Sequence, residues 1–114
     1  MANLALGEPA FLILTALAEQ PQHGYGMIDD VRRISDGRVE LRAGTLYAVL
    51  DRLRTDGLIE VDREEVVSSR LRRYYRLTAL GAERLAVEAE RLRHNARIAS
   101  ARLRAHRPAW GGGA

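Results

Sequence analysis

The sequence predicts a mainly α (α+β) fold in which three short helices precede a two-stranded hairpin and one long C-terminal helix. Three observations carry this prediction. Apolar residues recur at helical spacing in three separate segments before residue 57. Between residues 58 and 77 the pattern changes to alternation around a polar stretch, which is typical of a β-hairpin. From Thr78 onward a helical pattern continues almost to the end of the chain.

The first two helices differ in character. Pro9 is expected near the start of the first helix, because its fixed φ suits the first turn. Residues 10–18 are apolar most of the way round, as in a helix at the centre of a core. A turn at residues 20–24 separates it from a second helix over residues 25–35. The apolar face of the second helix consists of Met27, Ile28, Val31 and Ile34.

A third helix is expected from about Ala43 to Asp56, with Gly57 as its C-terminal stop. Leucines at positions i, i+4 and i+7 form its buried stripe. These leucines are Leu46, Leu50 and Leu53. Tyr47, Ala48, Asp51, Arg54 and Thr55 lie largely away from the stripe. Five residues form the candidate outward face: Thr45, Tyr47, Ala48, Asp51 and Arg54.

Residues 58–63 and 70–77 are predicted to form the two strands of the hairpin, joined by a polar connection over residues 64–69. A two-stranded hairpin is not stable alone, so it must pack on the helices. Because successive side chains of a strand point to opposite faces, Tyr75 and Leu77 are the expected core pair.

Arginine accounts for all 18 basic residues of the chain, whose net charge is +3. The second strand of the hairpin carries four of them and no acid: Arg70, Arg72, Arg73 and Arg76. Alternation turns Arg72 and Arg76 towards solvent. Since a guanidinium group holds a phosphate through two parallel hydrogen bonds, the cluster predicts contacts with nucleic acid.

The long helix begins after Thr78, a good N-cap residue, and is expected to end near Arg107, before Pro108. Such a helix is roughly 45 Å long at 1.5 Å per residue and extends past a domain of this size. One stripe repeats at alternating spacings of four and three, the heptad pattern of helices that pack in pairs. The stripe consists of Leu85, Ala89, Leu92, Ala96, Ala99 and Leu103. A second copy of the chain is the expected partner, which predicts a homodimer.

The chain is expected to comprise one domain over residues 1–77, a dimerisation helix over 78–107 and a flexible tail over 108–114. With 46% hydrophobic and 29% charged residues, the composition is that of a globular protein and argues against disorder. The absence of cysteine excludes disulfides and thiolate metal sites and suits the cytoplasm. No stretch reaches the roughly 18 apolar residues of a membrane helix.

Three helices followed by a hairpin is the element order of a winged helix-turn-helix. In that fold the third helix enters the major groove of DNA, and the hairpin, called the wing, contacts the DNA backbone or the minor groove. The five outward residues of the third helix are therefore expected to read base edges, and the four clustered arginines to contact phosphates. A dimer of such domains is expected to bind double-stranded DNA at a pseudo-palindromic operator.

Several short motifs, in this order, resemble the PadR family of bacterial transcriptional regulators. They are His-Gly-Tyr at residues 23–25, Gly-Thr-Leu-Tyr at 44–47, Asp-Gly-Leu-Ile at 56–59 and Arg-Tyr-Tyr-Arg-Leu-Thr at 73–78, followed by Gly81. The resemblance covers residues 12–85 and implies a winged-helix repressor that dimerises through its C-terminal helices and is released from its operator by a small-molecule effector. The single long helix is similar to that of the compact subgroup.

The resemblance also implies that Thr45 and Tyr47 face DNA. The family's wing commonly has Gly-Arg before its basic strand, whereas this chain has Ser69-Arg70, so its turn is expected to differ. Trp110 is the candidate stacking surface for an apolar or aromatic effector. The alternative is that Trp110 belongs to a tail with no binding role.

An enzymatic function is not expected. The three histidines lie far apart in the sequence, and no nucleophile–base pair, metal motif or cofactor motif accompanies them. The alternative to specific DNA binding is a winged-helix module that binds a partner protein, with the basic wing incidental to that interaction. Salt dependence distinguishes the two, because DNA binding releases counterions.

Overall fold

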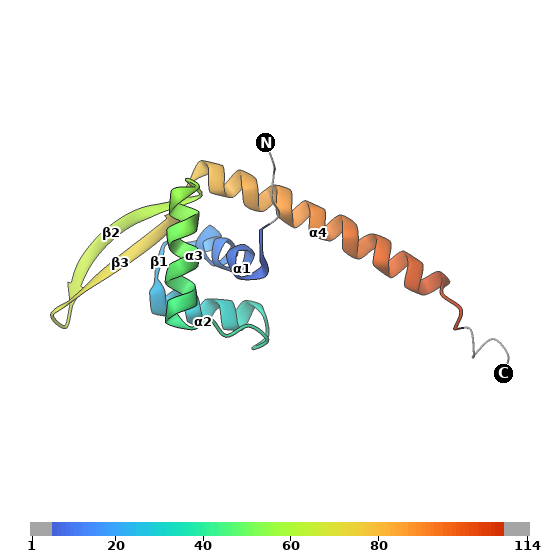
Figure 1. Ribbon diagram of the computed structural model, residues 1–114, viewed down its shortest axis with the longest axis horizontal. Helices are drawn as coiled ribbons and strands as arrows, with labels where there is room; N and C mark the ends of the chain where they lie inside the picture. Colours follow the sequence, from blue (N-terminus) through green and yellow to red (C-terminus); the bar gives the residue numbers. More distant parts are fainter. Residues whose placement is uncertain (1–5, 109–114) are drawn as a thin grey trace.

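The computed structural model describes residues 6–108, and these form four helices and a three-stranded sheet. In chain order the elements are α1 (Glu8–Glu19), β1 (Gln22–His23), α2 (Gly24–Ile34), α3 (Ala43–Thr55), β2 (Ile59–Val67), β3 (Arg70–Leu77) and α4 (Ala79–Ala105). Helices α1 to α3 form a body from which the β2–β3 hairpin and α4 extend in opposite directions (Figure 1). The predicted winged helix-turn-helix with a long C-terminal helix is confirmed.

The core lies among the first three helices and the base of the hairpin. Ile13 and Leu14 of α1 are fully buried, as expected of a central helix, and Leu46 and Leu50 of α3 are fully buried against them. Burying each such side chain contributes about 1.5–3 kcal/mol. Helix α3 ends as predicted, because Gly57 adopts a positive φ of 76°, which follows a helix readily only when the residue is glycine.

The sheet is antiparallel with strand order β1-β3-β2, so the wing has two strands but its base has a third. The sequence did not reveal β1, since two residues are too few to show alternation. Gln22 of this strand is buried, and its side-chain amide donates hydrogen bonds of 3.0 Å to the Ala16 carbonyl oxygen and to the Asp30 carboxylate. These bonds hold the turn between α1 and α2 against both helices.

The hairpin is longer than predicted, because the polar stretch over residues 64–69 is mostly strand. Only Ser68 and Ser69 turn the chain, and both have positive φ, 52° and 64°. Two-residue hairpin loops favour such paired positive φ values, which are usually supplied by Asn-Gly or Gly-Gly. The sequence prediction was wrong here since serine is not the usual signal for this turn, and Glu64 and Glu65 are polar because both faces of the wing are exposed.

A bulge at Asp62 shifts the register of β2 against β3 between Val61 and Arg63. Tyr75 remains in the core at 5% exposure with Leu77 half-buried beside it, so the predicted core pair is confirmed.

Helix α4 packs on the domain only through its first turns. Thr78 caps it, accepting a 3.0 Å hydrogen bond from the Gly81 backbone N–H. Leu85 packs against the core of its own chain and Ala89 is half-buried, so these two stripe residues already have neighbours within the protomer. Beyond them every described residue to the end of α4 is exposed. The uncovered part of the stripe comprises Leu92, Ala96, Ala99 and Leu103.

Glu88 is the one charged side chain buried where α4 meets the domain, among residues 6–108. Its carboxylate accepts hydrogen bonds from the Arg91 guanidinium and the Leu6 backbone N–H, and these bonds lower its pKa despite burial. The carboxylate therefore stays ionised and ties the start of the described chain to α4.

Candidate nucleic-acid interface

Helix α3 presents one uncovered face beside the wing. Leu46, Leu50 and Leu53 point into the core and leave the opposite side to solvent. All five residues predicted to face outward are exposed: Thr45, Tyr47, Ala48, Asp51 and Arg54. This face is the one available to enter a groove.

Tyr47 is both exposed and packed. It is 49% exposed, yet a Cβ atom added at Gly24 would lie 2.6 Å from its hydroxyl oxygen. The phenol therefore lies next to the first residue of α2, and a larger residue at that position would have to displace its hydroxyl end.

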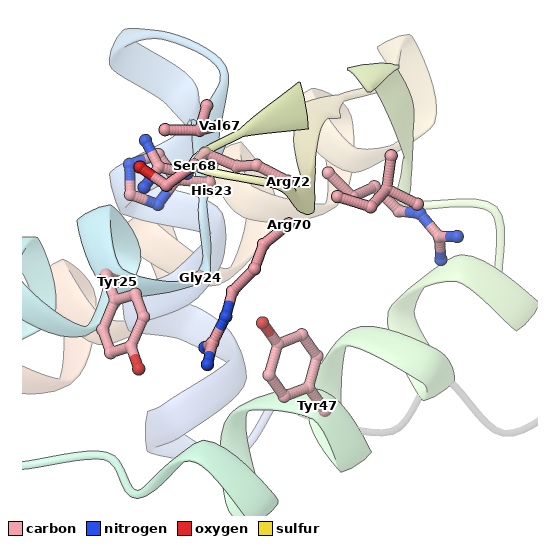
Figure 2. A pocket seen from close by; sticks show the side chains of 10 residues that line it. His23, Gly24, Tyr25, Tyr47, Val67, Ser68, Arg70 and Arg72 are labelled. Atoms are coloured by element: carbon pink, nitrogen blue, oxygen red, sulfur yellow. The ribbon is translucent and has the colours of Figure 1, made fainter. Parts of the chain in front are cut away.

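A cleft of about 310 Å³ lies between the wing, α2 and α3. Figure 2 shows the Arg70 side chain reaching from the wing to a position between the rings of Tyr25 and Tyr47. Tyr25 is 78% exposed, although aromatic rings are normally mostly buried. Sequence reasoning placed Tyr25 at the start of the second helix and gave it no role; its place in the His-Gly-Tyr motif was the signal that could have found it.

The wing arginines differ in their partners. Arg73 Nε donates to Glu64 at 2.8 Å, and Arg76 binds Glu60 at 2.8 Å and Asp62 at 3.1 Å. These ion pairs raise the pKa of both guanidinium groups. They are exposed pairs, which solvent screens, so a phosphate can displace the carboxylates at small cost.

Arg70 and Arg72 form no ion pair within residues 6–108. Arg70 is exposed, whereas Arg72 is half-buried at the wall of the cleft. Arg72 is therefore less exposed than the alternation of the strand predicts, because β1 pairs with β3 and brings His23 next to its face of the wing. The sequence revealed the four arginines, but it did not show which of them form ion pairs with the acids of β2.

His23 joins the wing to α2. Its Nδ1 accepts a hydrogen bond of 3.4 Å from the Gly26 backbone N–H and so caps α2. Its ring meets Tyr74 edge-on with centroids 5.2 Å apart. The pKa of His23 is lowered first by burial and then by the positive charge of Arg72. Tyr74 in turn donates to Glu65 at 2.8 Å, so His23 contacts a side chain held within the wing.

We expect His23 to make the stability of the domain sensitive to mild acid. Its folded pKa lies below the ordinary 6.5, so its contribution is complete above the unfolded pKa and is lost as the pH falls through the folded pKa. Protonation removes the Nδ1 acceptor of the cap, which acts in the same direction. Thermal unfolding at about pH 7.5 and about pH 5 measures this.

His23→Asn is the matched control, because asparagine caps helices without titrating. Between the two pH values the variant should lose less stability than the wild-type chain. Equal losses in both proteins would show that the cap does not respond to pH.

The helices, the wing and the exposed face of α3 define a winged-helix protein of the kind that regulates transcription. The sequence pattern of the PadR-like family of transcriptional regulators matches residues 13–87, about two thirds of the chain. The chain belongs to the PadR-like family of transcriptional regulators. The resemblance seen in the motifs is thereby confirmed, and the family is one of regulators rather than of enzymes.

Two relatives and one more distant structure illustrate this membership. The transcriptional regulator Rv3488 of Mycobacterium tuberculosis is 35% identical over 85 residues, 75% of this chain and 76% of its own. A PadR family transcription regulator from Clostridium difficile R20291 is 28% identical, with a TM-score of 0.72 over 85% of this chain and 99% of that one. Bacillus subtilis PadR, solved in complex with operator DNA, shares the fold at 20% identity, with a TM-score of 0.60 over 68% of this chain and 44% of its own.

Residues 6–108 contain neither a membrane-spanning helix nor a metal-binding cluster. No helix there is long and apolar enough to cross a membrane. The same residues contain no group of three or more histidine, aspartate and glutamate side chains placed to hold a metal ion. Trp110 and most of the predicted tail, residues 109–114, lie outside the described residues.

Proposed function

We propose that this chain is a sequence-specific DNA-binding repressor that acts as a homodimer. The observation that carries the proposal is the uncovered face of α3 lying beside a cleft lined by wing arginines, since that pairing supplies base-reading and phosphate-binding groups on one side of the domain. The operator complex of Bacillus subtilis PadR, which has the same fold, supports it.

In the proposed complex α3 lies in the major groove. Thr45, Tyr47, Ala48, Asp51 and Arg54 contact base edges there. Arg54 suits guanine, which accepts two hydrogen bonds from a guanidinium group, while the Ala48 methyl suits the thymine methyl. Phosphates are contacted by the four wing arginines, Arg70, Arg72, Arg73 and Arg76. In Arg73 and Arg76 the phosphate replaces the carboxylates that they bind in the free protein.

The dimer is proposed from the uncovered stripe of α4. Leu92 and Leu103 remain 40% and 71% exposed on a helix that extends away from the domain, and a second α4 would cover them. The stripe would then continue through Leu85 and Ala89, beside the domain. Two domains held in this way would present two α3 helices, so the operator is expected to be pseudo-palindromic.

Repression and its release are proposed from the family resemblance. A dimer bound over a promoter would block transcription, and a small apolar or aromatic effector would weaken that binding. The chain has a single tryptophan, Trp110, so its fluorescence reports an aromatic compound stacking on it. Quenching by compounds that also release DNA would support Trp110 as the effector surface; release without quenching would exclude it.

The direct test is a footprint on the DNA upstream of the protein's own and neighbouring genes, repeated at increasing salt. We expect protection of a symmetric site, with affinity falling steeply between about 50 and 200 mM salt. Salt-independent retention of a partner protein, with no footprint, would favour the protein-interaction module instead.

Two substitutions should separate positioning from reading. Arg72→Ala is expected to weaken binding to all sequences alike, because phosphate contacts carry no sequence information. Tyr47→Ala should change the order of preference among operator variants, measured by competition between duplexes. If Tyr47→Ala, like Arg72→Ala, weakened binding to every duplex by the same factor, Tyr47 would not be a base-reading residue.

A further inference from the structure

We propose that Tyr25, Tyr47 and Arg70 form a clamp for one phosphate of the DNA backbone, which fastens the wing to α2 and α3. The proposal rests on the DNA-binding function proposed above. It adds Tyr25, a residue of α2, to an interface otherwise made by α3 and the wing. The three side chains come from three different elements and converge on one cleft (Figure 2).

The charges of the wing favour an anion in this cleft. Acids of β2 form ion pairs with Arg73 and Arg76. These acids therefore do not pair with Arg70 or Arg72. None of the residues that line the cleft in the described part of the chain is acidic. Arg70 therefore brings an uncompensated positive charge into it, and Arg72 adds a second at its wall.

The donors match a phosphodiester. A guanidinium group offers two parallel N–H donors to two phosphate oxygens, and each phenol offers one O–H donor without adding charge. The Tyr47 hydroxyl lies next to Gly24 at the edge of the cleft, and with this hydroxyl on the phosphate the ring of Tyr47 is the part that contacts base edges. Tyr25 is largely exposed, which leaves its hydroxyl free to approach a ligand.

The position of the cleft favours duplex DNA over a free anion. Tyr47 lies on α3 between Thr45 and Ala48, two residues of the exposed face. When the exposed face of α3 lies in a DNA groove, the DNA backbone that borders this groove passes next to the cleft. A phosphate held there would touch the wing, α2 and α3 together, and binding would thus fix the angle between wing and body.

The first test measures the salt dependence of binding to a labelled duplex of mixed sequence, since a phosphate contact is independent of sequence. Arg70→Gln should reduce the slope of log affinity against log salt by about 0.9 per protomer. Arg104→Gln removes the same charge from the far end of α4 and should leave the slope unchanged. Equal slopes for both variants would overturn the clamp.

The second test removes only a hydroxyl. Tyr25→Phe should weaken binding about tenfold and leave the salt slope unaltered, because a hydrogen bond to a charged group is lost without loss of charge. Tyr74→Phe, which loses a hydroxyl bound to Glu65 within the wing, is the matched control and should bind as the wild type does. Unchanged affinity of Tyr25→Phe would exclude Tyr25 from the clamp.

Replacing single phosphates by neutral methylphosphonates identifies the partner. One position per half-site should weaken the wild-type protein but not Arg70→Gln, because the contact is already absent there. If no position shows this dependence, the clamp is wrong although DNA binding stands. If the wild-type chain binds no duplex at all, the proposed function fails and the clamp with it.

Discussion

Gly81→Ala is expected to destabilise the domain by about 3 kcal/mol or more, at the upper end of what overpacking costs. A Cβ atom at Gly81 would lie 2.0 Å from the Leu58 carbonyl oxygen and 2.9 Å from Leu77 Cδ1. The nearer atom belongs to the backbone immediately before β2 and accepts a hydrogen bond from the Thr78 N–H, so it cannot move aside without disturbing β2 and the start of α4. Chemical denaturation measures the loss, and α4 should separate from the wing.

Gly44→Ala is the matched control for this prediction. Gly44 lies in the first turn of α3, and no atom comes within 4 Å of a Cβ added there. The same substitution should then stabilise the domain by about 0.5–1 kcal/mol, because alanine favours the helix. Equal free energies of unfolding for the two variants would show that α4 does not approach Leu58 as closely as described.

Leu92→Asp should convert the protein to monomers and weaken operator binding on the order of a hundredfold or more. A charge in the α4 stripe opposes its burial against a second copy, and a lone domain loses the gain that comes from two linked half-sites. Leu92 is 40% exposed in the protomer, so the fold itself should tolerate the change. Sedimentation gives the mass, and a binding titration gives the affinity.

Ile98→Asp provides the comparison, because Ile98 is equally exposed, at 42%, on the same helix. Six residues separate the two positions, which places them roughly 120° apart around the helix. Ile98→Asp should remain dimeric. A dimeric Leu92→Asp variant, or two monomeric variants, would overturn the stripe as the interface.

Much of the fold follows from local pattern. The leucine stripe of α3, the glycine that ends it and the threonine that caps α4 were all predicted, because helix faces and helix ends depend on residues close in sequence. The turn of the wing was not predicted, since Ser68 and Ser69 adopt positive φ only where two paired strands require it. The strand β1 was missed for a related reason: Gln22 and His23 are strand only because β3 lies beside them.

The amino-acid sequence by itself determined the class of fold, the family and the residues exposed on α3, because hydrophobic period and short motifs are properties of neighbouring residues. Only the tertiary structure decided which of the wing arginines have acidic partners. Cross-strand acids engage Arg73 and Arg76, while the approach of β1 and α2 leaves Arg70 beside Tyr25. Charge neutralisation depends on distances between residues far apart in the chain, and those distances exist only once the elements have packed.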